Sequence, residues 1–410
     1  MTAAQQPPPP IYERHETMSR ASRILRRASA GILVSAALLT ASVFSGCGKK
    51  AGNGDEDLNG TGNGGQDGGN TTRPGDKEDD RDLLIARSAF LQNDFETAAQ
   101  HFALAAERDI PEAQYMFGEC LERGLGIEKA PDEALKWWRK AAENGNADAQ
   151  YRLGQCYEDG KYLEMDISEA VKWWEKAAGQ GLVIAQYTLG VCTEKGIGGE
   201  KDLTKAIEWY RNPAEQHYPP AQYNLGRCYY YGLGTKQDRK EAEKWFRLAA
   251  DEGGLPEARY MLGVCRFDAN DLTTAAEWFR KAADQGHAGA MFELGRCCEY
   301  GWGVARDVNE AAKRYRLAAD QGYAAAQCKL GEYCERGLGG IKKDINEAAV
   351  WYRKAAENGS AEAQYNLGEY CEYGLGGIKK DIDEAVKWYR MAAGQGNPNA
   401  REALERLSAD

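Results

Sequence analysis

The residues in this 410-residue chain that could most readily do chemistry are its eleven cysteines and four histidines. A zinc site needs cysteines or histidines at short, regular spacing, and a catalytic thiolate needs a base beside it. Cys297 and Cys298 are adjacent but have no histidine at metal-ligand spacing, and the histidines are scattered. The sequence therefore predicts no metal site, no thiol-based catalytic centre and no cofactor.

Other catalytic and nucleotide-binding motifs are missing as well. No Ser-x-x-Lys motif occurs, and Gly-rich loops such as 374–377 lack the Gly-Lys-Ser/Thr ending of a phosphate-binding loop. The many Asp and Glu residues recur at positions typical of helix caps and solvated helix faces rather than of a general-acid pair. We therefore predict that the chain is not an enzyme.

Nine of the cysteines recur two or three residues after a repeated glycine. Helical periodicity points these positions inward, on successive helices whose axes pack about 8–10 Å apart. A disulfide needs Cα atoms within about 7 Å. We therefore interpret these cysteines as small core residues, although reduced thiols are unusual in an oxidising compartment, where burial would protect them.

Two rows of side chains recur through the repeats and could bind a partner. One row is aromatic and lies two residues before the leucine of a Leu-Gly pair; the other is acidic and lies one or four residues after the glycine. Such rows would suit a peptide with basic and apolar side chains. Alternatively, the tyrosines pack between repeats and the glutamates only solvate a helix. The predicted partner-binding residues are Tyr115, Tyr151, Tyr187, Tyr223, Tyr260, Phe292, Tyr365, Glu119, Glu122, Glu332, Glu335, Glu369 and Glu372.

Residues 361–396 form the clearest copy of the unit that must position these rows. Leu367, Gly368 and Cys371 share one face of a helix by their spacing. The glycines that follow should end this helix, and Asp381 with the glutamate three residues later is the capping box of a second helix. One such hairpin cannot bury both of its faces, so the copies must stack.

The unit recurs eight times, and each copy is marked by the glycine of its Leu-Gly pair. These markers lie 32 to 37 residues apart, a period typical of helical-hairpin repeats. The pattern predicts an all-α solenoid of antiparallel helical hairpins. The markers are Gly118, Gly154, Gly190, Gly226, Gly263, Gly295, Gly331 and Gly368.

The repeats divide the chain. We predict a capping hairpin over residues 81–110, eight repeats over 111–396 and a closing helix over 397–410. Two repeats deviate, because the copy at 256–287 lacks the Gly-rich loop and Pro213 lies inside a predicted second helix. Proline in a helix interior is costly unless the helix kinks.

The N-terminal part has a different composition. We interpret residues 1–47 as a secretory leader, with arginines before an uncharged apolar run at 28–44 and small residues after it; the start could be Met1 or Met18. A short membrane-anchoring or buried helix is the alternative. Residues 48–80 are rich in Gly, Asn and Asp and predict a disordered tether.

The overall charge limits the partners. A net charge of −11 argues against non-specific nucleic-acid binding and against a basic membrane-surface patch. The mean hydropathy of −0.65 is typical of a soluble chain.

The repeated motifs Ala-Gln-Tyr-Asn-Leu-Gly, Tyr-Gly-Leu-Gly-Gly and Lys-Trp-Tyr-Arg-x-Ala-Ala resemble the Sel-one-like repeat family, a relative of the tetratricopeptide repeats, over about residues 81–400. The resemblance implies a right-handed all-α superhelix that serves as a protein-interaction scaffold, with no single reaction or partner. Some exported members carry disulfides within each repeat, and some were reported to bind penicillin. Where those relatives place a cysteine near the end of the second helix, this chain has Ala141 and Ala142.

The segment 44–47 resembles the processing box of bacterial lipoproteins, which implies lipidation of Cys47 and cleavage before it. Phe44 stands where that box usually has leucine. Gly48 rather than aspartate follows, which by the resemblance favours the outer membrane.

Together these patterns predict a non-enzymatic, exported scaffold that is anchored by lipid at Cys47 to the cell envelope, facing the periplasm or the surface. It would bind an unknown protein or peptide in a concave groove, without metal or nucleic acid. One alternative is a penicillin-binding or β-lactam-hydrolysing relative. The other is a cytosolic scaffold with a non-functional leader.

Overall fold

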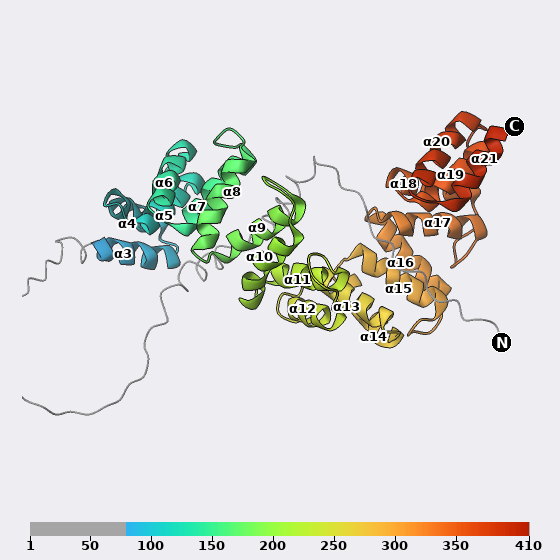
Figure 1. The fold of residues 1–410 in the computed structure, drawn as a ribbon, viewed down its shortest axis with the longest axis horizontal. Coiled ribbons are helices and arrows are strands. Elements are labelled where there is room, and N and C mark those ends of the chain that lie inside the picture. The colour runs from blue at the N-terminus through green and yellow to red at the C-terminus, as the bar shows by residue number, and fades with distance from the viewer. Residues whose placement is uncertain (1–78, 410) are drawn as a thin grey trace, which may run out of the picture. The chain divides into compact units, whose positions relative to one another are not determined.

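The computed structural model describes residues 79–409, which form nineteen α-helices and, within that range, no strand (Figure 1). The chain divides into two compact units, and we call unit 1 the described residues up to Trp209 and unit 2 those from Tyr210. None of the described helices is both long and apolar enough to cross a bilayer. The predicted leader with its lipidation site, and nearly all of the predicted tether, lie outside the described residues.

Unit 1 consists of helical hairpins in which a first helix leads into an antiparallel second helix. Each first helix also packs on the second helix of the preceding hairpin, so the hairpins stack in sequence order. The helices are α3 (Asp79–Leu91), α4 (Phe95–Glu107), α5 (Pro111–Arg123), α6 (Pro131–Glu143), α7 (Ala147–Asp159), α8 (Ile167–Gly179), α9 (Val183–Lys195) and α10 (Leu203–Glu215), which crosses the boundary between the units.

Unit 2 repeats this arrangement and ends in a single helix that packs on the last hairpin. The predicted all-α superhelical stack of antiparallel hairpins is confirmed. The helices are α11 (Pro219–Tyr231), α12 (Arg239–Asp251), α13 (Pro256–Asp268), α14 (Leu272–Ala283), α15 (Ala288–Tyr300), α16 (Val308–Asp320), α17 (Ala324–Arg336), α18 (Ile345–Glu357), α19 (Ala361–Tyr373), α20 (Ile382–Gly394) and α21 (Pro398–Ala409).

The helix ends largely follow the predicted capping chemistry. Asp381 is the N-cap of α20, and its side chain accepts a hydrogen bond from the Glu384 backbone N–H at 2.9 Å. Gly374 ends α19 in the left-handed conformation, with φ at 71°. Only half of the predicted capping box forms, because the Asp381 N–H donates to the carbonyl of Cys371 at 2.8 Å rather than to Glu384.

In seven of the described hairpins the marker glycine lies in close contact with an aromatic ring of the second helix. An ideal Cβ on Gly368 would lie 2.5 Å from Cε1 of Tyr389, nearer than real Cβ atoms come to any neighbour. Any side chain at this position would therefore push the two helices apart. The same contact joins Gly118 to Trp138, Gly154 to Trp174, Gly226 to Phe246, Gly263 to Phe279, Gly295 to Tyr315 and Gly331 to Tyr352.

Buried glutamines join one hairpin to the next. Gln364, on α19, donates its side-chain N–H to the Ala356 carbonyl of α18 at 3.1 Å and accepts a hydrogen bond from Gln395, just after α20, at 2.8 Å. The Gln364 side chain thus joins α18 and α19 to the end of α20, and both its amide nitrogen and its amide oxygen are hydrogen-bonded. Gln114, Gln150 and Gln327 make the same two kinds of hydrogen bond.

Two hairpins have a tight turn in place of the Gly-rich loop. The turn between α3 and α4 contains Asn93, and the turn between α13 and α14 contains Asn270, both with φ at 61°. The Gly-rich loop of the following repeat closes over each turn, since a Cβ on Gly126 or Gly303 would lie 2.0 or 2.1 Å from a carbonyl oxygen at the start of α4 or α14. A shortened repeat therefore still stacks on its neighbour.

Pro213 lies within α10, as predicted, and the helix continues past it to Glu215. The Gln216 N–H still donates to the Asn212 carbonyl at 3.0 Å. The proline lies in the last turn of the helix, so it disturbs only the hydrogen bonds near the helix end.

We expect Gly368→Ala to lower the free energy of unfolding by about 1–3 kcal/mol, because the added methyl group overlaps the ring of Tyr389. Gly394→Ala, at the exposed end of α20 with no atom within 4 Å of its Cβ, is the matched control and should be neutral or slightly stabilising. Urea unfolding followed by circular dichroism measures both. Equal stability of the two variants would contradict the close-approach explanation.

His287 is a cap whose protonation state matters. Its Nδ1 accepts a hydrogen bond from the Ala290 N–H at 3.0 Å at the start of α15, and its ring stacks on Tyr260 at 4.7 Å. Burial lowers the pKa of His287 below 6.5. The unfolded chain therefore binds a proton before the folded chain does as the pH falls, and stability is lost below about pH 6.5.

We expect His287→Asn to weaken this pH dependence, since asparagine caps α7 at the equivalent position, where Asn146 accepts from the Ala149 N–H at 2.8 Å. Melting temperatures at pH 7.5 and 5.5 compare the two proteins. The wild type should lose more stability on acidification than the variant. An equal loss in both would show that His287 does not titrate in this way.

Candidate functional site

The cysteines are core residues, as predicted. All ten within the described residues are buried thiols on first helices. Burial raises the pKa of Cys156 to about 11 and that of Cys192 to about 12, so these thiols carry little thiolate at neutral pH. No group of three or more His, Cys, Asp or Glu side chains within residues 79–409 is arranged to hold a metal ion.

The predicted aromatic row packs inside the hairpins. Tyr365 lies 5.7 Å from the ring of Tyr389, and Tyr260 lies 5.9 Å from that of Phe279. Burial leaves little of the row for a partner, so partner binding stays a prediction that concerns mainly its half-buried members. Tyr115, Tyr187 and Phe292 are buried, whereas Tyr151, Tyr223, Tyr260 and Tyr365 are half-buried.

Several predicted carboxylates of unit 2 are already hydrogen-bonded by tyrosines of this chain. Glu335, at the end of α17, accepts from the hydroxyl of Tyr352 on α18 at 3.0 Å and from that of Tyr370 on α19 at 3.1 Å. A charged acceptor strengthens such bonds, so Glu335 joins its own hairpin to the next one.

Glu372 occupies the same position in the last repeat and is buried. It accepts from the Tyr389 hydroxyl at 2.8 Å and from two N–H groups of Arg406 at 2.6 and 2.8 Å. The hydrogen bonds from Arg406 are the main reason that the pKa of Glu372 is lowered. Helix α21 therefore supplies an arginine where a further repeat would supply a tyrosine.

This pairing of tyrosine with glutamate was missed by the sequence reasoning, although a signal exists. Tyr315 pairs with Glu299 at 2.6 Å, as Tyr352 and Tyr389 pair with the equivalent glutamates. Where the second helix carries Phe246 or Phe279, which have no hydroxyl, the position of the glutamate holds Tyr230 or Phe267. Comparing the repeats of this one chain reveals the match.

Two further predicted carboxylates of unit 2 lie one residue after their marker glycines. Both are half-buried and already have partners within the chain. Glu332 forms ion pairs with Lys329 at 2.6 Å and Arg336 at 3.0 Å. Glu369 accepts from the Tyr365 hydroxyl at 2.9 Å. These contacts stay within a single first helix.

In unit 1 the structure brings two predicted carboxylates, Glu119 and Glu122 of α5, into one polar cluster. Glu122 accepts from the Tyr162 hydroxyl at 2.8 Å and from the Lys161 amine at 3.1 Å, both in the loop after α7. Burial would raise the pKa of Glu122, but these two hydrogen bonds outweigh it and the pKa is lowered. Glu122 is therefore an anion that attaches the loop to α5.

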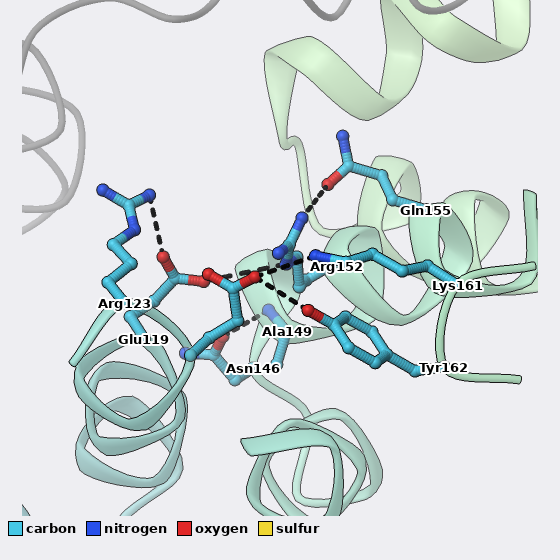
Figure 2. Close-up of polar contacts among 9 residues, drawn as sticks. Glu119, Arg123, Asn146, Ala149, Arg152, Gln155, Lys161 and Tyr162 are labelled. Carbon is cyan, nitrogen blue, oxygen red and sulfur yellow. Dashed lines mark hydrogen bonds and ion pairs between the residues drawn. The ribbon is translucent and has the colours of Figure 1, made fainter. Parts of the chain in front are cut away.

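Glu119 is more deeply buried, and its two arginine partners lie on either side of it (Figure 2). Arg123 contacts it at 2.9 Å, and Arg152 of α7 lies 3.7 Å away with its guanidinium 4.5 Å from the ring centroid of Trp138. Burial raises the pKa of Glu119, with the arginines opposing the shift. We call Glu119, Glu122, Arg123, Arg152 and Lys161 the α5–α7 cluster.

The accessible charge of the α5–α7 cluster is positive. The side chains of Glu119 and Glu122 are only 8% and 15% exposed, whereas those of Arg123 and Lys161 are 44% and 58% exposed. The ion pairs with Glu119 and Glu122, which are the more buried partners, fix the positions of Arg123 and Lys161. An anionic group of a partner, such as a peptide carboxylate, would meet oriented donors there.

The comparisons with known proteins concern the repeats. The model of the Sel1 repeat matches eight segments of the chain, and a search of the curated proteins found no match. The matched segments are 111–146, 147–182, 183–217, 219–254, 256–287, 288–323, 324–360 and 361–397.

Two solved structures share the fold at appreciable sequence identity. A protective antigen of uropathogenic Escherichia coli strains that displays an SLR fold is 28% identical, with a TM-score of 0.57 over 81% of this chain and 81% of that chain. A Sel1 repeat protein from Oxalobacter formigenes is 30% identical, with a TM-score of 0.59 over 75% of this chain and 89% of that chain.

Proposed function

Because the chain belongs to the Sel1 repeat family, whose members are generally protein-interaction scaffolds, we propose that it binds an acidic segment of a partner protein at the α5–α7 cluster of unit 1. The family is typically non-catalytic, and a binding role needs no reacting group. The observation that carries this proposal is the exposure of Arg123 and Lys161 above two almost buried carboxylates.

The proposal reverses the charge that the sequence suggested for the partner. The glutamates expected to meet basic side chains are already paired within the chain, both in the α5–α7 cluster and at Glu335 and Glu372. A basic peptide would have to displace those internal partners, at the cost of leaving them unpaired. An acidic peptide meets half-exposed cations instead.

Aromatic and apolar contacts would add to this recognition. Tyr151 of α7 is half-buried, with its hydroxyl 3.4 Å from that of Thr188 on α9. A peptide that lies along the first helices from the α5–α7 cluster toward α9 would cover this edge. Phosphate-like or carboxylate groups would dock at the cluster, and apolar side chains beside Tyr151.

We also propose that the protein is exported and anchored by lipid at Cys47 in the cell envelope, facing the periplasm or the surface. The support is the order of arginines, uncharged apolar run and processing box in the sequence. An exported location would also match the description of the E. coli relative as a protective antigen.

We expect peptides selected from a random display library on the whole mature protein to be enriched in Asp and Glu. Their affinity should fall about tenfold or more in Arg123→Ala/Lys161→Ala, because both exposed donors are lost. Lys136→Ala, which removes an exposed lysine on α6, is the matched control and should change little. Selection of mainly Lys- and Arg-rich peptides would contradict the proposal.

Labelled palmitate should be incorporated when the full chain is expressed in a Gram-negative bacterium, and Cys47→Ala should abolish incorporation, because that thiol is the proposed acceptor. The label is measured by autoradiography of the purified protein. Incorporation that persists in the variant would exclude Cys47 as the site, and none in the wild type would favour a cytosolic scaffold.

A further inference from the structure

Helix α3 begins unit 1, and no described hairpin precedes it (Figure 1). Helix α5, the first helix of the next hairpin, packs on α4 before it and on α6 after it. Its third, sixth and tenth residues, Ala113, Met116 and Cys120, are 0%, 5% and 0% exposed. They lie on the side of α5 away from Gly118, which faces α6, so the preceding hairpin covers them.

The same three positions of α3 are exposed. They hold Arg81, Leu84 and Ser88, and Leu91 lies on the same side of the helix, seven residues after Leu84. Leu84 and Leu91 are 60% and 53% exposed. The side of α3 that a preceding hairpin would cover therefore carries two uncovered leucines. We call Arg81, Leu84, Ser88 and Leu91 the α3 face.

The described C-terminal end of the stack offers no surface that matches these leucines. Helix α21 takes the place of a first helix, with Ala400 buried as its third residue. Its eighth residue is Glu405, where the repeats carry the marker glycine, and Arg401 and Glu402 are exposed beside it. Head-to-tail stacking of two copies through α21 would place these charges against the leucines, which is unfavourable.

The α3 face is instead complementary to itself. Consider two α3 helices that run antiparallel about a two-fold axis between residues 87 and 88. Leu84 of each copy then lies opposite Leu91 of the other, because the two leucines are equally far from the axis. Ser88 lies beside the axis, where a small side chain allows the two helices to approach closely.

The charges at the ends of such a pair are also complementary. Along the helix, Arg81 lies about 10 Å from the axis, and Leu91 of the other copy lies about 5 Å from it on the same side. Arg81 therefore stands just beyond the C-terminal end of the other α3, where free carbonyl groups attract a cation. The exposed Asp94, which is the N-cap of α4, follows that end in the chain and adds a negative charge there.

We propose that the α3 face binds a second copy of this chain in an antiparallel two-fold dimer. One helix of 13 residues per copy buries less than the roughly 800 Å² per partner of a standard interface, so we expect a weak dimer in solution. The proposed lipid anchor at Cys47 would strengthen it, because anchored copies have a high local concentration. That increase rests on the proposed anchor, whereas the contact itself depends neither on the anchor nor on the α5–α7 cluster.

Cross-linking in cells that express the full chain tests the geometry. Ser88→Cys should give a disulfide-linked dimer on a non-reducing gel after oxidation with copper phenanthroline, because the two new thiols lie beside the axis. The ten native cysteines within residues 79–409 are buried, and the wild type reveals any link through Cys47. Leu104→Cys, at an exposed position of α4 outside the α3 face, is the matched control and should give no dimer beyond that of the wild type.

Sedimentation velocity of the mature chain without lipid, residues 48–410, measures the association apart from the anchor. The dimer fraction of the wild type should rise with protein concentration. Leu84→Glu/Leu91→Glu should raise the dimer dissociation constant about tenfold or more, because four carboxylates would meet at the contact. Leu104→Glu is the control and should dimerise like the wild type. Melting curves must show that the variants fold, and the single substitutions replace the double one if it does not.

A wild type that stays monomeric at every concentration, together with no cross-link in Ser88→Cys, would overturn the proposal. Equal dimerisation of the wild type and the double glutamate variant would overturn it as well, since the contact would lie elsewhere. A third contrary result is a monomer whose cosedimentation with phosphatidylglycerol vesicles is lost in that variant, which would identify a lipid surface. Dimerisation in solution without cross-linking in cells would support the contact and count against the anchor.

Discussion

The arrangement of seven of the hairpins depends on the absence of a side chain at the marker glycine. At Gly331 and Gly368 the ring of a tyrosine occupies the space that a Cβ would need. The two helices can therefore approach until their backbones and one ring are in contact. This approach sets the direction of each first helix, and thus where its tyrosine, cysteine and glutamate lie. The buried glutamines then carry the same geometry from one hairpin to the next.

In several ion pairs of this acidic protein the carboxylate is more buried than its cationic partner. Carboxylates such as Glu119, Glu335 and Glu372 lie largely covered and accept hydrogen bonds from tyrosines or arginines of the same chain. Their partners Arg123, Lys161 and Arg406 keep their aliphatic stems on the surface and their charged groups outward. A net charge of −11 therefore says little about the charge that a partner meets at a given face. The α5–α7 cluster, for example, exposes Arg123 and Lys161 although the whole chain is acidic.

The sequence was sufficient for the hairpins, because the spacing of Gly368, Gly374 and Asp381 reports on local backbone geometry. It was insufficient for the candidate site. Helical periodicity identified the face on which Tyr115 and Glu119 lie, but not that neighbouring helices would bury both. The contact between Arg152 and Glu119 joins two repeats, and no local rule predicts it. The matching of Tyr352 with Glu335 could have been found by aligning the repeats with one another.

The central claim is that Glu119, Glu122 and Glu372 are largely covered, while the cations paired with them, Arg123, Lys161 and Arg406, are accessible. Covalent labelling of the folded, full-length protein, with a carbodiimide for carboxylates and an acylating reagent for lysines, tests it most directly when read by mass spectrometry. The structure predicts slow labelling of Glu119 and Glu372 and fast labelling of Lys161, Lys313 and Lys387. Labelling of Glu119 and Glu372 as fast as that of the exposed Glu133 would contradict it.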